Sequence, residues 1–355
     1  KIMNGTAYYE IPMPAGIPYF GASIEDKIYY KGVFYYLALR LNSLKKVYCH
    51  FNFVIHHDLA QLLKEKLHAK IVFTLHYTDW SFDLLGDREW LKHILKNPSG
   101  IKGKRVADKI EMEKRFMLEV CDYVIAIARH SYNMLKEVYG IPESKLVCIP
   151  NGLRDEYKKR NFEERQRLRE KYGFKENEKL LIFAGRLDLV KGIIELIEAF
   201  KLIQIENSSV RLIIAGSGSL TRCFEAASPI WSHITFTGFI PKEQLDELYA
   251  ISDIGIVPSI HEEFGYVATE MMLNELPVIV HNTTGLKEIV NDGKYGITFD
   301  FGKNRDVYML KNIIVNALEQ IEKGISLPNG RDKVLSTYSI QSFSERIVDV
   351  YLKCD

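Results

Sequence analysis

Residues 179–220 read KLLIFAGRLDLVKGIIELIEAFKLIQIENSSVRLIIAGSGSL. Two short apolar runs in this stretch each end at a glycine, and the segment between them has its apolar residues at helical spacing. A strand, a helix and a second strand in this order form a βαβ unit, in which the two strands are parallel. The stretch therefore predicts a parallel sheet covered by helices.

The same alternation recurs on both sides of this unit and forms two series. The first series has four apolar runs, at residues 46–53, 70–75, 122–128 and 145–150. The second is more regular and has six, at residues 179–184, 210–215, 233–237, 253–258, 277–280 and 296–299. We therefore expect an α/β protein built from two Rossmann-like, doubly wound parallel sheets.

The boundary between the two domains is predicted at the turn Pro150-Asn151-Gly152, which closes the first series. We assign residues 1–150 to an N-terminal domain and residues 151–337 to a C-terminal domain. Residues 338–355 form an amphipathic helix that we expect to reach back and brace the first domain.

The beginning of the chain departs from this plan. A doubly wound domain normally opens with a buried strand and a glycine-rich turn, but residues 1–26 are rich in turn signals and include Pro12, Pro14 and Pro18. The opening strand and its glycine-rich loop are therefore expected to be missing from this sequence. The alternative is a short domain that starts differently.

Composition excludes several classes of protein. The 355 residues are 47% hydrophobic and 26% charged, which fits globular domains and rules out disorder, collagen and coiled coil. The formal net charge of +1 lacks the basic excess of a dedicated nucleic-acid binder. The five cysteines include no C-x-x-C pair, and no apolar stretch reaches the roughly 20 residues of a membrane span, so we expect a cytoplasmic protein with reduced thiols.

Ligands of open parallel sheets bind beyond the carboxyl ends of the strands. Arg186 and Lys191 follow the strand at 179–184, beside the start of the next helix, where two cations suit a diphosphate. Two surface charges on a loop are an equally good explanation from this local pattern. Gly216 and Gly218 follow the next strand and would let the backbone approach a ligand or turn tightly. The apolar turn at Phe239 and Ile240 could hold a flat base.

The run HEEFGYVATEMM carries two glutamates with seven residues between them. Glu262 precedes Phe264 and Gly265 and is expected in a loop, whereas Glu270 is expected on the following helix, with both facing one cleft. A carboxylate can accept two hydrogen bonds from the vicinal hydroxyls of a ribose. Two surface glutamates at a helix start would produce the same spacing.

The first domain offers one candidate histidine. His76 lies just beyond the strand at 70–75, where it could face a diphosphate bound to the other sheet. A lone histidine is more often structural, and we assign structural roles to the other candidates, His50, His56, His57 and His130.

Taken in order, the motifs GRLDLVKG, AGSG, TGFIPKEQLDELYAISDIGIVPS, EEFGYVATEMM and GLKEIVNDGKYG resemble the family-4 retaining glycosyltransferases of the GT-B fold. The resemblance covers residues 120–300 and is loose in the first hundred residues. It departs from the family at Val190, where relatives often carry an acidic residue before the lysine. The glycine-rich acceptor loop of the family is not visible.

This resemblance implies two domains that face a central cleft, with a nucleotide-sugar donor bound mainly by the C-terminal domain and the acceptor by the N-terminal one. Arg186 and Lys191 would hold the diphosphate, Glu270 the ribose, and Phe239 and Ile240 the base. The donor sugar would meet the run Glu262, Phe264, Gly265 and Tyr266, and His76 would lie near the donor sugar and the acceptor.

The expected activity is retaining sugar transfer from a nucleotide-diphosphate donor to a hydroxyl of an acceptor that the sequence does not identify. UDP-sugar is favoured on family frequency and GDP-sugar is the other donor. No D-x-D motif occurs, so no metal or other cofactor is expected. A catalytically silent sugar-nucleotide binder, a GT-B phosphorylase and an epimerase stay open. The basic stretch from Arg88 to Arg115 leaves peripheral membrane contact open, although a solvated helix is favoured.

Overall fold

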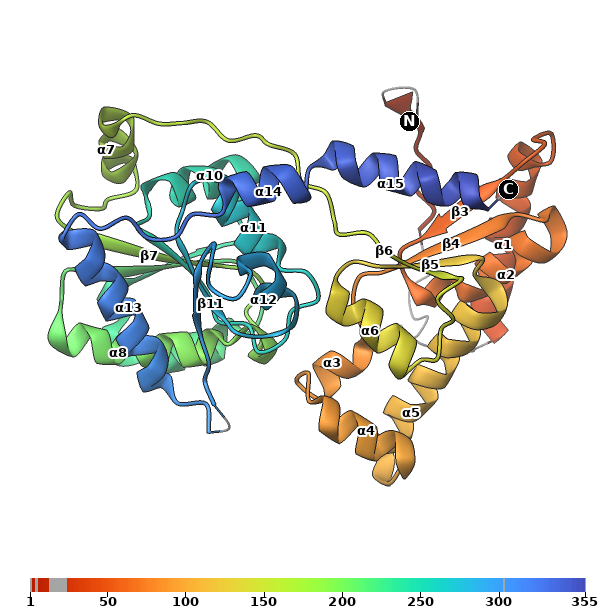
Figure 1. The fold of residues 1–355 in the computed structure, drawn as a ribbon, viewed down its shortest axis with the longest axis horizontal. Helices are drawn as coiled ribbons and strands as arrows, with labels where there is room; N and C mark the ends of the chain where they lie inside the picture. The colour runs from red at the N-terminus through yellow and green to blue at the C-terminus, as the bar shows by residue number, and fades with distance from the viewer. Residues whose placement is uncertain (1, 4–5, 13–23, 303, 355) are drawn as a thin grey trace.

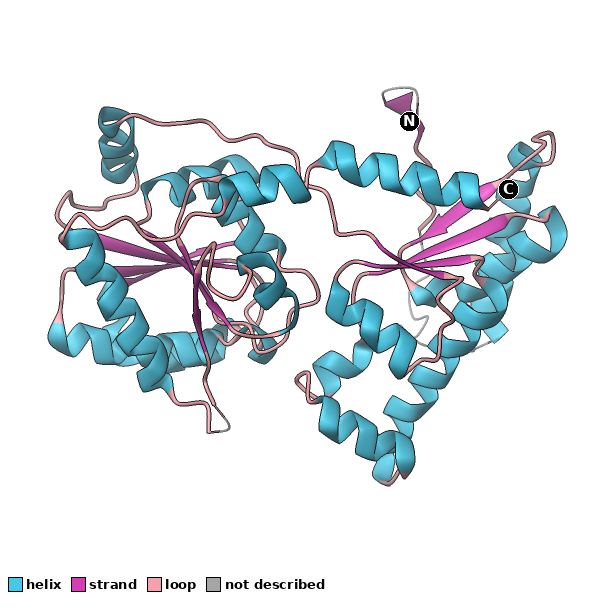
Figure 2. Cartoon of the chain, in the orientation of Figure 1, coloured by secondary structure: helices cyan, strands magenta, loops and turns pink. Residues whose placement is uncertain are grey.

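The computed structural model describes residues 2–3, 6–12, 24–302 and 304–354, and it consists of two α/β domains (Figure 1). Each domain has a parallel sheet with helices packed on it (Figure 2). The predicted fold class is therefore confirmed. Pro14 and Pro18 of the turn-rich beginning lie outside the described residues. Within the described residues, no helix is both long and apolar enough to cross a membrane.

The N-terminal sheet has four parallel strands in the order β3-β4-β5-β6. The strands are β3 (Tyr48–Phe51), β4 (Lys70–Leu75), β5 (Tyr123–Ala126) and β6 (Leu146–Cys148). Each apolar run of the first series thus forms a strand, and the central strands β4 and β5 are buried along most of their length, as their apolar runs predict. The connecting helices are α2 (His57–Leu67), α3 (Asp79–Asp83), α4 (Arg88–Lys96), α5 (Gly100–Arg115) and α6 (Arg129–Glu137), with short helical turns η1 (Val54–His56) and η2 (Phe116–Val120).

The segment before this sheet contains a helix and a small separate ribbon. Strands β1 (Ile2–Met3) and β2 (Thr6–Ala7) pair antiparallel with each other and are not part of the four-stranded sheet. Helix α1 (Ile24–Leu41) buries Tyr30 and Phe34 in the same apolar core as β4. Among the described residues, β3 is thus the first strand of the N-terminal sheet.

The C-terminal sheet has six parallel strands in the order β12-β11-β10-β7-β8-β9. They are β7 (Lys179–Ala184), β8 (Val210–Ala215), β9 (Ile234–Gly238), β10 (Ile254–Val257), β11 (Val278–His281) and β12 (Ile297–Phe299). The chain runs outward from β7 to β9 and then returns to the other side of β7 with β10. The order of the strands therefore reverses between β7 and β10, and this switch point is where doubly wound sheets bind ligands.

Helices cover both faces of the C-terminal sheet (Figure 2). Two apolar cores, one on each face, include Leu181 and Ile182 of the central strand β7 on opposite sides. The helices are α7 (Phe162–Lys171), α8 (Ile193–Glu206), α9 (Leu220–Ala227), α10 (Lys242–Ile251), α11 (Tyr266–Leu273), α12 (Thr284–Val290), α13 (Val307–Glu322) and α14 (Arg331–Thr337), with short turns η3 (Leu189–Lys191) and η4 (Ser228–His233).

The last helix, α15 (Ile340–Lys353), lies on the N-terminal sheet, as the dark blue helix of Figure 1 shows. Its residues Ile347 and Val350 are buried against Val72 and Ile125 of β4 and β5. The chain therefore crosses between the domains twice. At the crossings Leu153 pairs with Ser339, and its backbone exchanges hydrogen bonds with Tyr338 and Ile340.

Candidate active site at the sheet switch point

Lys191 and Glu262 form an ion pair at the switch point. The Nζ of Lys191 lies 2.6 Å from Oε2 of Glu262, and both side chains are about four-fifths buried. Lys191 ends the turn η3 after β7, and Glu262 lies in the loop after β10, as the sequence predicts for that glutamate. The neighbouring strands β7 and β10 therefore carry the two groups to one place.

Close backbone contact holds the two loops together. The carbonyl of Val190 accepts a hydrogen bond from the Ile260 amide at 2.8 Å. A Cβ added to Gly192 would lie 2.2 Å from the carbonyl oxygen of Pro258, and the residue has φ +66°. Only glycine both lacks a Cβ and adopts this positive φ without strain, so Gly192 lets the two loops approach each other. Val190 stands where relatives often carry an acidic residue. This difference leaves both the Val190–Ile260 hydrogen bond and the Lys191–Glu262 ion pair in place.

Arg186 lies on the same edge of the sheet but is less constrained than Lys191. Its side chain is 62% exposed and its Nη2 lies 3.2 Å from Oδ2 of Asp188. The guanidinium also lies 5.0 Å from the ring centroid of Phe82, which belongs to the N-terminal domain. Arg186 therefore faces the cleft between the domains and is accessible to an anion there.

A cavity of about 260 Å³ adjoins Arg186, and its lining is almost entirely apolar. Three strand-end loops form it and contribute Arg186, Gly216, Phe239 and Ile240. Phe239 is 85% exposed, so it forms a rim that a planar group could cover. Four predicted donor-site residues are therefore brought together in one cavity.

The glycines after β8 allow loops to contact each other. A Cβ on Gly216 would lie 1.8 Å from the carbonyl oxygen of Gly185, and one on Gly218 would lie 2.7 Å from that of Leu187. Gly216 has φ +147°, and its amide donates a hydrogen bond to Gly238. These contacts pack the loops after β7, β8 and β9 together. Gly216 also lines the cavity beside Arg186, and the predicted ligand approach at Gly216 and Gly218 stays a prediction.

Glu270 lies on α11, as predicted, and lines a second cavity of about 230 Å³ with Tyr266, Lys242 and Asp246. Burial raises the pKa of the Glu270 carboxyl and raises the pKa of Tyr266 to about 12. Val267, on the same helix, lines the apolar cavity beside Arg186. Helix α11 thus separates the two cavities and contributes a wall to each.

Phe264 and Gly265 connect the Glu262 loop to α11. The Phe264 ring is buried, with its centroid 5.1 Å from Tyr266 and 5.4 Å from Tyr338. Its side chain is therefore part of the core, and only its backbone can reach a ligand. Gly265 precedes the first residue of α11.

His76 lies at the carboxyl end of β4, at the predicted place. Its Nε2 lies 2.8 Å from Oδ1 of Asn52, and burial lowers the pKa of the imidazole, so the neutral ring is favoured. Asn52 follows β3, so this hydrogen bond of His76 is made within the N-terminal domain.

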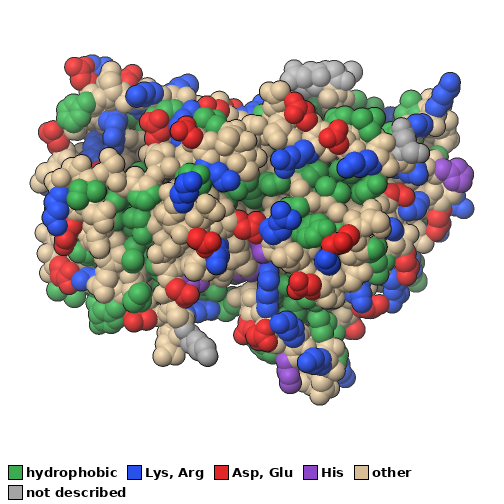
Figure 3. All heavy atoms as spheres, in the orientation of Figure 1, with side chains coloured by type: hydrophobic (Ala, Val, Ile, Leu, Met, Phe, Trp, Pro, Cys, Tyr) green, Lys and Arg blue, Asp and Glu red, His purple; other side chains and the backbone are tan. Residues whose placement is uncertain are grey.

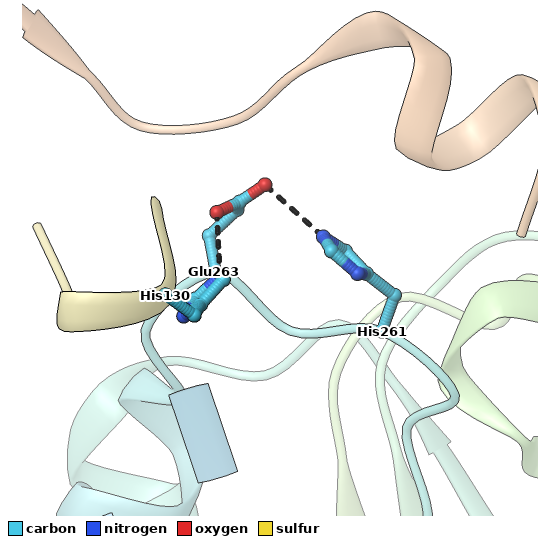
Figure 4. A group of neighbouring side chains, drawn as sticks. All are labelled: His130, His261 and Glu263. Carbon is cyan, nitrogen blue, oxygen red and sulfur yellow. Dashed lines mark hydrogen bonds and ion pairs between the residues drawn. The ribbon is translucent and has the colours of Figure 1, made fainter. Parts of the chain in front are cut away.

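A cluster that no sequence motif predicted lies where the two domains meet and consists of His130, His261 and Glu263 (Figure 4). His130 Nε2 lies 2.9 Å from Oε2 of Glu263, and His261 Nε2 lies 3.0 Å from Oε1 of the same carboxylate. His130 comes from the N-terminal domain and the other two residues from the loop that carries Glu262. His130 is therefore an interdomain contact residue, which its position in the sequence did not indicate.

Other groups extend this contact. Glu288 of α12 accepts hydrogen bonds from the amides of Arg129 and His130 at the start of α6, at 2.8 and 2.7 Å. The Trp80 ring lies 5.8 Å from His261. Burial alone would raise the pKa of Glu263, but hydrogen bonds from His130 and His261 outweigh burial and hold the pKa well below its usual range. The carboxylate is therefore ionised at neutral pH.

Basic and acidic side chains are interspersed on the face of the molecule drawn in Figure 3, without a large patch of one sign of charge. This mixture agrees with the net charge of +1. Polyanion binding along that whole face is thus not indicated.

Two family models match the chain, one in each domain. Residues 15–157 match Glycosyltransferase Family 4, and residues 164–321 match Glycosyl transferases group 1. Together with the two-domain fold, these matches confirm the resemblance noted in the sequence. The chain is an enzyme, a family-4-like glycosyltransferase of the GT-B fold.

Relatives at the level of sequence are also glycosyltransferases. A Methanocaldococcus jannaschii protein described as a glycosyltransferase is 29% identical over 308 residues, which are 78% of this chain and 74% of that one. The lipopolysaccharide 1,2-N-acetylglucosaminetransferase of Salmonella typhimurium is 29% identical over 58% of this chain and 56% of its own length.

Solved structures share the fold. HepE from Anabaena, in complex with UDP-glucose, superimposes with a TM-score of 0.73 at 18% identity, over 92% of this chain and 82% of that chain. Sucrose-phosphate synthase from Thermosynechococcus elongatus has a TM-score of 0.71 at 19% identity, over 92% of this chain and 78% of its own.

Proposed function

We propose that the chain transfers a sugar, with retention of anomeric configuration, from a nucleotide-diphosphate donor to a hydroxyl group of an acceptor. The observation that carries this proposal is the Lys191–Glu262 pair at the switch point, with Arg186 on the same edge. A buried cation with a partner carboxylate, on the same sheet edge as an apolar cavity that Arg186 lines, suits a ligand that combines a diphosphate, a sugar and a base. UDP-sugar is the favoured donor, and the neighbour HepE in complex with UDP-glucose supports it; GDP-sugar is the alternative.

Lys191 and Arg186 are the proposed diphosphate ligands. Negative charge builds on the leaving diphosphate as the glycosidic bond breaks, so fixed cations stabilise the transition state more than the ground state. Lys191 is held in place by Glu262, whereas Arg186 can move towards the diphosphate from its exposed position. Glu262 would then accept hydrogen bonds from donor-sugar hydroxyls, beside the backbone of Phe264 and Gly265.

Glu270 is the proposed ribose ligand, and Phe239 with Ile240 is the proposed base platform. Tyr266 and Gly216 would contribute to the walls around the nucleotide. This arrangement requires the ribose to reach past the α11 wall that separates the two cavities. Glu270→Ala should therefore weaken donor binding in calorimetry, and an unchanged affinity would remove Glu270 from the donor site.

Same-face attack is the proposed chemistry. The leaving phosphate oxygen takes the acceptor proton while the acceptor oxygen bonds to the anomeric carbon, so no protein base is needed. His76 would position the acceptor or donor sugar near this centre. Closure of the domains would exclude water that could hydrolyse the donor.

Three measurements test the proposal. A thermal-shift screen with UDP- and GDP-sugars should identify a donor that raises the melting temperature, because a ligand that binds only the native state stabilises it. NMR of the transfer product should show the retained anomer, and an inverted product would contradict the mechanism. We also propose that no Mg²⁺ or Mn²⁺ assists the diphosphate, so that a strict requirement for either ion would contradict this part.

A cytoplasmic location is proposed for the enzyme. All five cysteines lie among the described residues and none forms a disulfide, which supports a reducing compartment. Peripheral contact with the inner face of a membrane stays a proposal for the basic stretch from Arg88 to Arg115.

A further inference from the structure

We propose that His130, His261 and Glu263 bind a Zn²⁺ ion, which holds the two domains together beside the donor site. The three side chains offer two imidazole nitrogens and a carboxylate oxygen, whose atoms lie within 4.8 Å of one another. Two histidines and one carboxylate form a ligand set that suits zinc, whereas Mg²⁺ prefers oxygen ligands alone. The site is separate from the Arg186 and Lys191 groups proposed for the diphosphate.

The geometry needs only a small rearrangement. Both Nε2 atoms already point at the Glu263 carboxylate, at 2.9 and 3.0 Å (Figure 4). Ligand atoms around a tetrahedral zinc with bonds of about 2.0–2.1 Å lie roughly 3.3 Å apart, so an ion can enter when the hydrogen bonds open slightly. Each imidazole then carries its proton on Nδ1 and coordinates through Nε2. A neutral imidazole reaches this form when its proton moves from Nε2 to Nδ1, and a doubly protonated imidazole reaches it by releasing the Nε2 proton to solvent.

The surroundings of His130 favour metal coordination. Its Nδ1 is buried and has no hydrogen-bond partner, yet it lies 3.4 Å from Oε1 of Glu288. Histidine ligands of metals commonly donate their other N–H to a carboxylate, which fixes the ring orientation and raises its basicity. Glu288 stands where such a partner is needed, and it also holds the start of α6 through the Arg129 and His130 amides.

Charge and burial favour a divalent cation. The side chains of His130 and Glu263 are each 11% exposed, and His261 is 5% exposed. Two carboxylates, Glu263 and Glu288, face this small space. In the zinc-bound form both imidazoles are neutral, so the two carboxylates balance the charge of Zn²⁺. The nearby Lys191 already pairs with Glu262 and does not neutralise them.

The position of the cluster gives the ion a structural role. His130 belongs to the N-terminal domain, and His261 with Glu263 flanks Glu262 in the C-terminal loop. A bound ion would therefore fix the two domains in the arrangement seen here, together with the loop that carries Glu262. This role differs from a metal on the diphosphate, because Zn²⁺ would stabilise the fold with no donor present.

The test is metal binding by the full chain, without any assay of transfer. The protein is stripped with a chelator, desalted and titrated with ZnCl₂, and elemental analysis then counts the ions retained. We expect one Zn²⁺ per chain, a higher melting temperature with Zn²⁺ and no shift with Mg²⁺. Retention of no zinc by the stripped wild-type chain would overturn the proposal, and this arm needs no variant to fold.

Variants locate the ion. His261→Gln and Glu263→Gln should each abolish retention, whereas His93→Gln, which changes an exposed histidine of α4, should retain one ion. Glu288→Gln should weaken affinity about 10-fold to 100-fold, as loss of a carboxylate behind a histidine ligand does. Co²⁺ in place of Zn²⁺ should give the visible absorption of a tetrahedral site in the wild type and lose it in Glu263→Gln. Zinc bound equally by wild type and both cluster variants would overturn the assignment.

Discussion

The two sides of the cleft are constrained to different degrees. On the C-terminal side, the loops after β7, β8, β9 and β10 touch through backbone hydrogen bonds and glycines, and Lys191 is fixed by Glu262. On the N-terminal side, Phe82 is exposed, and the His76 side chain is hydrogen-bonded to Asn52 of its own domain. The C-terminal side, which we propose binds the donor, is therefore preorganised, whereas the N-terminal side, proposed for the acceptor, is shaped mainly by how the domains meet.

The largest effect on activity should come from removing Lys191, the buried cation of the C-terminal side. Lys191→Ala should lower turnover on the order of a hundredfold, which corresponds to about 3 kcal/mol of transition-state stabilisation. Steady-state kinetics with a saturating donor measure it. Lys201→Ala, which removes a lysine paired with Glu198 on α8, is the matched control. A loss of only a few fold in Lys191→Ala would mean that the cation does not act on the leaving group.

The contact between the loops after β7 and β8 can be disrupted without changing a charged residue. Gly216→Ala places a methyl group 1.8 Å from the Gly185 carbonyl oxygen, so we expect a loss of stability of about 2 kcal/mol, seen as a lower melting temperature. The control is Gly173→Ala, which also has positive φ, +75°, but has no atom within 4 Å of the added Cβ. Equal losses of stability in the two variants would show that strain from the positive φ, and not contact between the loops, causes the loss in Gly216→Ala.

Acid should weaken the attachment of α15 to the less constrained domain. His50 links Tyr351 and Thr74 at 2.7 and 2.6 Å, and burial, followed by the charge of His76, lowers the pKa of His50 to about 4. A lowered pKa means that the folded state favours the neutral ring. Its stabilisation is complete above the unfolded pKa of about 6.5 and is lost as pH falls towards 4.

Denaturant unfolding at two pH values measures this loss. Between about pH 7 and pH 5.5 the wild type should lose on the order of 1 kcal/mol more stability than His50→Gln, which lacks the titrating group. The difference between the two proteins is informative because His56 and His76, whose pKa values are also lowered, titrate in both. Parallel pH profiles would exclude His50 as the titrating contact.

The smallest effect should come from a contact across the cleft. Phe82→Ala removes the ring beside Arg186, and the loss of an exposed cation–π contact costs about 0.5 kcal/mol, so the donor KM should rise two- to threefold. Trp90→Ala, which removes a similar pair with Lys102 on the outer surface, should leave KM unchanged. An unchanged KM in Phe82→Ala as well would mean that closure does not depend on this ring.

The strands and the donor-side spacing were predictable because they depend on local pattern. Apolar runs buried on both faces mark the strands of parallel sheets, and the turn at Phe264 and Gly265 separates the loop position of Glu262 from the helical position of Glu270. The close contact of Gly216 with the Gly185 loop was not predictable from sequence. A glycine after a strand looks the same in the sequence whether a ligand or another loop approaches it.

The interdomain cluster could not be found from pattern. His130 and Glu263 are 133 residues apart and meet only because the two domains dock, which no local spacing encodes. The one signal was the density of ionisable residues in His261-Glu262-Glu263, where the prediction used only the middle residue. His76 was placed correctly at a strand end, but that position alone did not reveal its partner Asn52.

The twofold crossing of the chain near Leu153 restricts how the enzyme can open. Two covalent connections lie side by side there and are hydrogen-bonded to each other, so they tether the two domains at one place. A motion that leaves these bonds intact keeps the residues beside Leu153 close together, and the residues that lie farther from this tether move apart more.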